Sequence, residues 1–147
     1  MSALLDRVAR RYRYIIAEIP AHAAGALERV LHMPSTLVLV SDARLASARD
    51  VARWRTWFAE SASERNCLHV LNMAGAPGTL PVAEFANVAG AQPNVIIPYS
   101  ADIATQALVG SASAPAGALA KAIHPLASTF GLETTQARRP LLKRMFG

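Results

Sequence analysis

The sequence has a single cysteine, Cys67, and few aromatic residues, which make up 6% of its 147 residues. One cysteine excludes an internal disulfide and any zinc site built from several cysteines. No apolar run approaches the roughly 18 residues of a membrane-spanning helix. Asp6 and Arg7 interrupt the first apolar run too early for a signal peptide. We therefore expect a protein of a reducing, cytoplasmic compartment.

Two phosphate-binding motifs are also missing. A P-loop needs Gly-Lys-Ser/Thr, and Lys121 and Lys143, the only lysines, follow alanine and leucine. No Gly-x-Gly-x-x-Gly follows a predicted strand. The histidines lack the i, i+4 spacing of a helical metal pair, so we expect no metal site and interpret them as ordinary surface or strand-end residues: His22, His32, His69 and His124.

What the sequence does have is a hydrophobic fraction of 52%, enough for a packed core, and a net charge of +5. All but two of its 15 cationic residues are arginine, the side chain that binds phosphates and carboxylates in a planar fork. An acidic partner is consistent with this composition.

Short apolar runs rich in β-branched residues alternate with amphipathic stretches of helical period. The pattern predicts strands at 14–19, 36–40, 68–72 and 94–98, and helices at 4–12, 23–32, 46–59, 81–88, 103–108 and 119–130. Such alternation predicts an α/β fold with a parallel sheet of about four strands and helices on both faces. We assign residues 1–132 to this domain and residues 133–147 to a basic, amphipathic tail.

Four segments carry a further pattern. Residues 13–20 read Arg-Tyr-Ile-Ile-Ala-Glu-Ile-Pro, residues 41–50 read Ser-Asp-Ala-Arg-Leu-Ala-Ser-Ala-Arg-Asp, residues 70–75 read Val-Leu-Asn-Met-Ala-Gly, and residues 97–100 read Ile-Pro-Tyr-Ser. In order and spacing they resemble the C-terminal half of the ATPase domain of the MinD/ParA family, a P-loop NTPase fold. The second segment is similar to the CpaE/TadZ branch, which serves Tad pilus assembly. The chain is then a fragment or a degenerate paralogue.

The resemblance implies roles for individual residues. Glu18 matches the position of a catalytic acidic residue, and it equally fits a carboxylate facing solvent. Asn72, Pro98 and Tyr99 match the nucleotide-binding positions, although Asn72 also suits a turn cap. Four residues match the family's dimer interface: Arg44, Ser47, Arg49 and Asp50. They equally fit the solvated first turn of a helix. The complete family domain uses ATP and magnesium, whereas we expect no cofactor for this chain alone.

The tail after Pro140 is amphipathic. Leu141, Leu142, Met145 and Phe146 would gather on one side of a short helix, opposite Lys143 and Arg144. This arrangement suits an anionic membrane surface, as in MinD-type relatives, or a strap that closes over the helices of the domain.

We therefore expect a Tad/Flp-type pilus-assembly protein of the CpaE/TadZ group, which localises or regulates the secretion machine, peripherally at the inner membrane, without hydrolysing ATP by itself. Expected partners are the pilus secretion machinery and either a missing N-terminal half or a second copy. In the family, the P-loop strand lies between the strands that match residues 14–19 and 36–40. This chain lacks that strand, so we expect an exposed sheet edge that can pair with another chain. The alternatives are a ParA-like module that binds DNA through arginine-rich surfaces and a small α/β enzyme with an unrecognised site.

Overall fold

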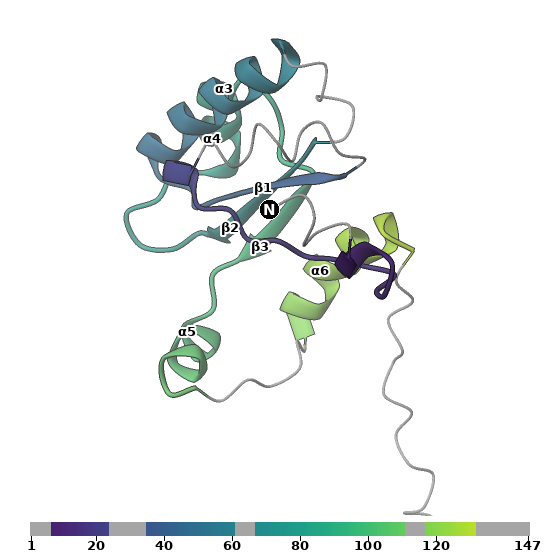
Figure 1. Ribbon diagram of the computed structural model, residues 1–147. Helices are drawn as coiled ribbons and strands as arrows, with labels where there is room; N and C mark the ends of the chain where they lie inside the picture. Colours follow the sequence, from purple (N-terminus) through teal and green to yellow (C-terminus); the bar gives the residue numbers. More distant parts are fainter. Residues whose placement is uncertain (1–6, 24–34, 61–66, 111–116, 132–147) are drawn as a thin grey trace, which may run out of the picture. The chain divides into compact units, whose positions relative to one another are not determined.

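The structure is a computed structural model, and it describes residues 7–23, 35–60, 67–110 and 117–131. The chain divides into two compact units, Met1–Ser35 and Thr36–Gly147. The second unit contains a parallel sheet with its helices (Figure 1).

The sheet has three parallel strands in the order β1 (Leu37–Ser41), β2 (Cys67–Ala74) and β3 (Val95–Pro98). Leu39 of β1 lies beside His69 of β2, and Val70 of β2 lies beside Val95 of β3. The pairing of β2 with β3 is irregular between Leu71 and Ala74. The α/β class, the parallel sheet and the predicted strands 36–40, 68–72 and 94–98 are thus confirmed.

Four helices follow the predicted positions closely: α3 (Leu45–Glu60), α4 (Val82–Ala89), α5 (Ala101–Leu108) and α6 (Gly117–Thr129). Helix α4 ends where Gly90 adopts a left-handed conformation with φ 75°, which costs glycine little. Helix α6 continues through Pro125 rather than splitting there.

The core lies between the sheet and helices α3 and α4. Leu71 from the central strand meets Val51 of α3 and Phe85 of α4, all nearly inaccessible to solvent. Small residues let the helices approach closely: Ala43, Ala48 and Ala89. Helix α6 packs against β3, on the side of the sheet away from α3 and α4 (Figure 1). We conclude that β2, at the centre of the sheet, provides most of the buried strand surface.

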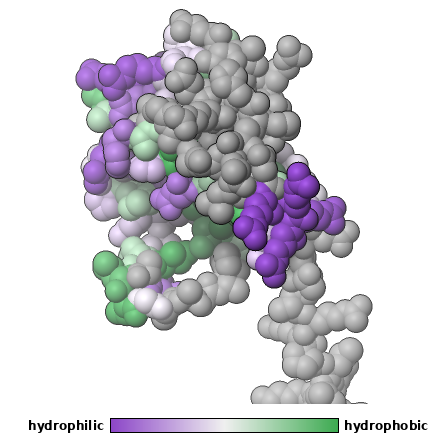
Figure 2. Space-filling view, in the orientation of Figure 1, coloured by the Kyte–Doolittle hydropathy of each residue, from purple (hydrophilic) through white to green (hydrophobic). Residues whose placement is uncertain are grey.

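Helix α5 contributes little to this core. Among the described helices and strands it has no extensive packing partner, and its end is apolar and exposed at Leu108 and Val109. Figure 2 shows this apolar surface in green over α5.

The first unit differs from the prediction. Residues 14–19 form no strand; their backbone is irregular between a helical turn at residues 7–9 and a short 3-10 helix, η1 (Ala21–Ala23). Ile16 is 94% exposed, so the apolar run is not buried. The prediction of a strand here, and hence of about four strands in the described sheet, is wrong, because an apolar run forms a strand only where a neighbour satisfies its backbone groups.

Of the predicted helix over residues 23–32, the structure describes only Ala23, at the end of η1, and the amphipathic tail over residues 133–147 lies outside the described residues. Of the helices that the structure does describe, none combines the length and the apolar character needed to cross a membrane.

Candidate functional site

The carboxyl ends of β2 and β3 bring the three predicted nucleotide-binding residues together. Pro98 pairs in register with Ala74, and the backbone N–H of Tyr99 donates to the carbonyl of Ala74 at 2.9 Å. Asn72 stands two residues earlier on β2. Because parallel α/β sheets bind ligands at the carboxyl ends of their strands, this edge is the candidate functional site.

Asn72 sits in the irregular part of the sheet. Its Oδ1 accepts a hydrogen bond from the backbone N–H of Met73 at 2.9 Å. Met73 has φ 57°, and it is the one non-glycine residue with positive φ among those described. The half-buried Asn72 therefore uses one lone pair of its Oδ1 to stabilise the turn at Met73, which leaves the second lone pair and the NH2 group of Asn72 for a ligand.

Tyr99 leaves part of its ring accessible at this edge. Asn72 offers an amide with both donor and acceptor groups, and Tyr99 offers an aromatic surface. These are the kinds of group that bind the edge and the face of a planar heterocycle.

The end of β1 carries a second polar cluster around Asp42. The Ser47 hydroxyl and the Arg44 backbone N–H both donate to Oδ1 of Asp42, and Nε of Arg44 lies 3.6 Å from Oδ2. The pKa of Asp42 is lowered, mainly by the Ser47 hydroxyl, with help from the Arg44 amide and charge and against the effect of burial. The Asp42 carboxylate therefore ties the loop before α3 to the first turn of the helix through the Ser47 hydroxyl, and a negative charge is favourable near a helix N-terminus.

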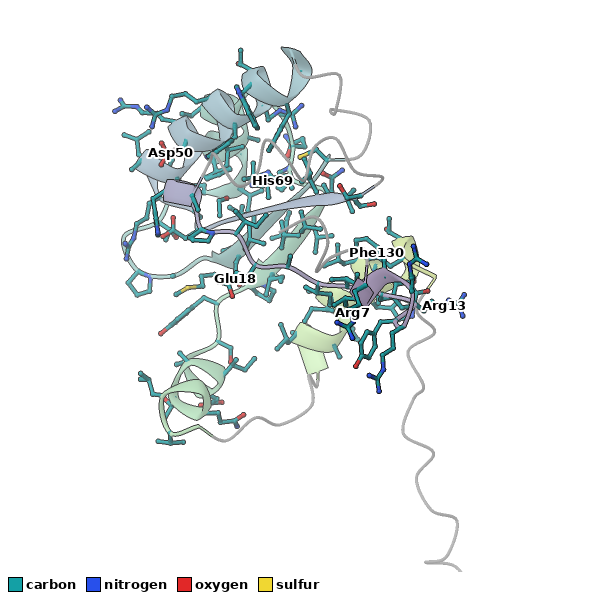
Figure 3. All side chains as sticks on the ribbon, in the orientation of Figure 1. Arg7, Arg13, Glu18, Asp50, His69 and Phe130 are labelled. Atoms are coloured by element: carbon teal, nitrogen blue, oxygen red, sulfur yellow. The ribbon has the colours of Figure 1, made fainter. Side chains whose placement is uncertain are left out.

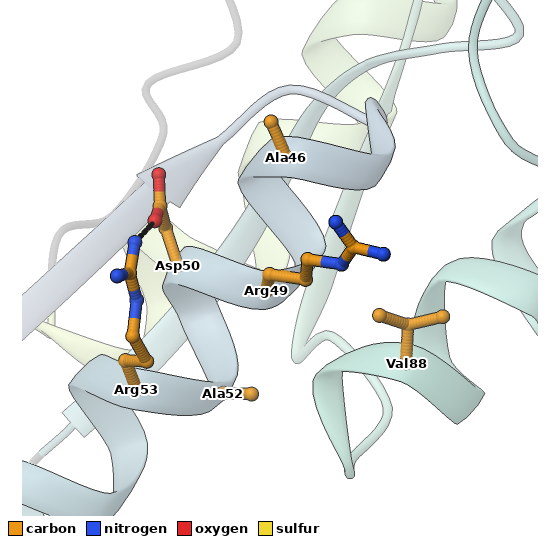
Figure 4. A pocket seen from close by; sticks show the side chains of 6 residues that line it. All are labelled: Ala46, Arg49, Asp50, Ala52, Arg53 and Val88. Carbon is orange, nitrogen blue, oxygen red and sulfur yellow. Dashed lines mark hydrogen bonds and ion pairs between the residues drawn. The ribbon is translucent and has the colours of Figure 1, made fainter.

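The remaining two predicted dimer-interface residues lie farther along α3. Asp50 forms an ion pair with Arg53, and both line a surface depression with Ala46, Arg49, Ala52 and Val88. Figure 4 shows Arg49 extending across this depression toward Val88 of α4. The four predicted interface residues thus form two groups: Arg44 and Ser47 contact Asp42 at the start of α3, and Arg49 and Asp50 line the depression.

Glu18 is exposed in the irregular backbone of the first unit. The prediction placed it at the end of a strand, and that strand is not formed in the structure. The six residues predicted to bind a membrane surface, Leu141, Leu142, Lys143, Arg144, Met145 and Phe146, lie outside the described residues.

His69 is the polar residue that sequence reasoning missed. It lies on the sheet (Figure 3) and is 2% exposed. Its Nε2 lies 2.9 Å from Oγ of Ser41, and its ring stacks on Phe85 of α4. Burial and, to a smaller extent, the positive charge of Arg55 lower the pKa of His69 to about 4. The interpretation as a surface or strand-end histidine is wrong, because His69 shares the buried face of the central strand with Leu71.

The backbone of His69 ties β2 to the loop before β3. Its N–H donates to Oδ1 of Asn94 at 2.7 Å, and the N–H of Asn94 donates back to the His69 carbonyl at 2.8 Å. The alternation of Cys67-Leu68-His69-Val70-Leu71 was the available signal, since residues 69 and 71 must face the same side of a strand.

Across the described ranges, no three side chains of His, Cys, Asp or Glu gather closely enough to hold a metal ion. Comparisons with protein-family models, with curated proteins and with solved structures found no match. The relationship to the MinD/ParA family therefore stays a prediction from the four sequence segments.

Proposed function

We propose that this chain is a CpaE/TadZ-like protein of Tad/Flp-type pilus assembly, which positions or regulates the secretion machine and does not hydrolyse ATP by itself. The observation that carries this proposal is the meeting of Asn72, Pro98 and Tyr99 at the carboxyl edge of a parallel sheet. These three residues were selected from the sequence by their resemblance to a base-binding site. In the described sheet they lie at or near the carboxyl ends of adjacent strands, where parallel α/β sheets commonly bind ligands, and this supports the proposal.

Phosphate binding is the step that this chain does not supply. Triphosphates are held mainly by backbone N–H groups of a glycine-rich loop and by its lysine, and the sequence contains no such motif. The Asn72 and Tyr99 edge would therefore sense an adenine base weakly, without the anchor that hydrolysis needs. This is the basis for proposing a regulatory role and not an enzymatic one.

The proposed partners follow from the same interpretation. The depression lined by Arg49, Asp50 and Val88 is the proposed contact with the pilus machinery or with a homologous subunit. The tail over residues 141–146 is the proposed contact with an anionic membrane surface, which would hold the protein at the inner membrane.

The test has a binding arm and a cellular arm. Calorimetry should detect no micromolar ATP binding, whereas NMR titration with adenosine at about millimolar concentration should shift the signals of Asn72 and Tyr99. Tyr99→Ala should abolish these shifts, and the exposed Tyr12→Ala should leave them unchanged. Micromolar ATP affinity, or adenosine shifts that Tyr99→Ala does not affect, would contradict the proposed site.

In the bacterium that encodes the chain, deletion of the gene should reduce the number of surface pili, and a fluorescent fusion should form foci at the inner membrane. Normal piliation in the deletion strain would contradict the pilus function whatever the outcome of the binding arm.

DNA binding is the second candidate, and one observation favours it: three arginines are exposed, Arg44 just before α3 and Arg49 and Arg53 on α3. Two of them are partly neutralised, because Arg44 pairs with Asp42 and Arg53 pairs with Asp50. Gel shifts at two salt concentrations decide the matter, since non-specific DNA binding must weaken steeply as salt rises.

A further inference from the structure

In the described sheet, β1 is an edge strand. The described sheet runs β1-β2-β3, so β1 pairs with β2 on one side only. Among the described residues, the backbone hydrogen bonds of Leu37–Ser41 all belong to this pairing, and none reaches the other side of the strand. An edge strand of this kind presents a row of N–H and C=O groups that another strand can pair with.

Nothing in the sequence of β1 protects this edge. The strand reads Leu-Val-Leu-Val-Ser, with no charged residue, no proline and no glycine. Val38 is 37% exposed and Val40 is 60% exposed, on the face opposite to the one where Leu39 contacts the core. Natural edge strands usually carry lysine, proline or a bulge to prevent pairing, so β1 lacks the usual defences.

We infer that β1 pairs antiparallel with β1 of a second copy, which joins the two three-stranded sheets into one continuous sheet. A two-fold axis at Leu39 uses the whole strand: Leu39 lies opposite Leu39 of the partner subunit, and Val38 lies opposite Val40 of the partner subunit. The same patch serves both copies, as a two-fold interface requires.

The chemistry of the strand selects a second copy as the occupant. An uncharged strand can face itself without like-charge repulsion, and two Val–Val pairs would cover the exposed side chains. A membrane headgroup or a nucleic acid would need cations at this edge, and β1 has none.

The size of the interface sets its strength. Five residues at about 3.4 Å each make a strand of roughly 17 Å, so the buried area falls at the low end for specific interfaces. We therefore expect a reversible dimer that forms with concentration.

The first test measures association of the full chain by sedimentation equilibrium, with valines replaced by lysine at matched exposed positions. Val40→Lys should raise the dimer dissociation constant at least about tenfold, because a charge would enter both cross-strand pairs. Val109→Lys carries the same change at an exposed valine after α5 and should leave the constant unchanged. A monomeric wild type at about 500 µM, or a dimer that Val40→Lys does not weaken, would overturn the inference.

The second test needs no destabilising charge. Chains carrying Val38→Cys and Val40→Cys are mixed and oxidised, and the unaltered chain with Cys67 serves as the background. The inferred pairing predicts disulfide-linked dimers that contain one chain of each kind, since residue 38 faces residue 40 across the axis. Equal cross-linking of Val38→Cys with itself, or no cross-linking in the mixture, would overturn the pairing.

A third variant, Val88→Lys, tests whether the chain associates through β1 or through the proposed partner surface on α3 and α4. Because Val88 lines the depression, its substitution should not weaken association through β1. Loss of the dimer in Val88→Lys alone would assign self-association to the depression and would overturn the inference.

Discussion

Acidification should lower the free energy of unfolding, because His69 is buried in its neutral form. The imidazole is enclosed by Ser41 on β1 and Phe85 on α4, and the charge of Arg55 opposes a second positive charge there. Protonation would place an imidazolium in this buried position, where the hydrogen bond to Ser41 cannot replace the lost hydration. The folded state therefore holds His69 neutral well below the pH at which an exposed histidine takes up its proton.

The size and sign of the effect follow from the pKa. The unfolded chain binds a proton on His69 near pH 6.5, and the folded chain binds it near pH 4. Between these values the unfolded state holds more protons, so the free energy of unfolding falls as pH falls from 6.5 to about 4. At about 1.4 kcal/mol for each pH unit, the full loss is about 3 kcal/mol, a large part of the stability of an ordinary domain.

Urea unfolding measured at several values between about pH 7.5 and pH 4 tests this reasoning. His69→Gln keeps a group that can bond to Ser41 but does not titrate, so its stability should fall less steeply over the same range. His124→Gln changes an exposed histidine and should follow the wild type. Parallel curves for the wild type and His69→Gln would refute the assignment of the acid sensitivity to His69.

Three further predictions concern Asp42, the core and the tail. Asp42→Ala removes the oxygen that accepts hydrogen bonds from the Ser47 hydroxyl and from the Arg44 backbone N–H, and it should lower the unfolding free energy by about 1 kcal/mol in urea unfolding at neutral pH. An unchanged midpoint would contradict this stabilising role. Phe85→Ala should lower the unfolding free energy by about 3 to 5 kcal/mol, because the side chain is fully buried against Leu71. Phe85→Leu should lower it clearly less, and equal losses would argue against the described packing. A chain that ends at Ala137 should sediment less with anionic vesicles than the full chain, and equal sedimentation would eliminate the tail as a membrane contact.

The sheet was predictable where local pattern and tertiary environment agree. Residues 68–72 and 94–98 are apolar runs that the sheet buries at Leu71 and Val95, so composition alone located them. Residues 14–19 have an equally apolar composition and form no strand, because hydrogen-bonding partners are a property of the neighbours and not of the run itself. One sequence alone does not show which segment lies beside a given apolar run in the folded protein.

The candidate site was predictable in position and less so in detail. The order of the segments ending at Asn72 and Tyr99 was sufficient to place both at one edge, because the carboxyl ends of parallel strands meet there. The left-handed turn at Met73 was not predictable, since methionine gives no local signal for positive φ. His69 was missed for a similar reason: its burial depends on Phe85, which is distant in sequence.

The irregular pairing between Leu71 and Ala74 has a consequence for how sequences of this kind can diverge. It separates the part of β2 that holds the core from the part that presents Asn72, because Leu71 is buried against Phe85 whereas Met73 points into an exposed turn. Substitutions at the turn should therefore alter the proposed recognition surface around Asn72 at little cost in stability. The same core can thus support different residues at this edge of the sheet.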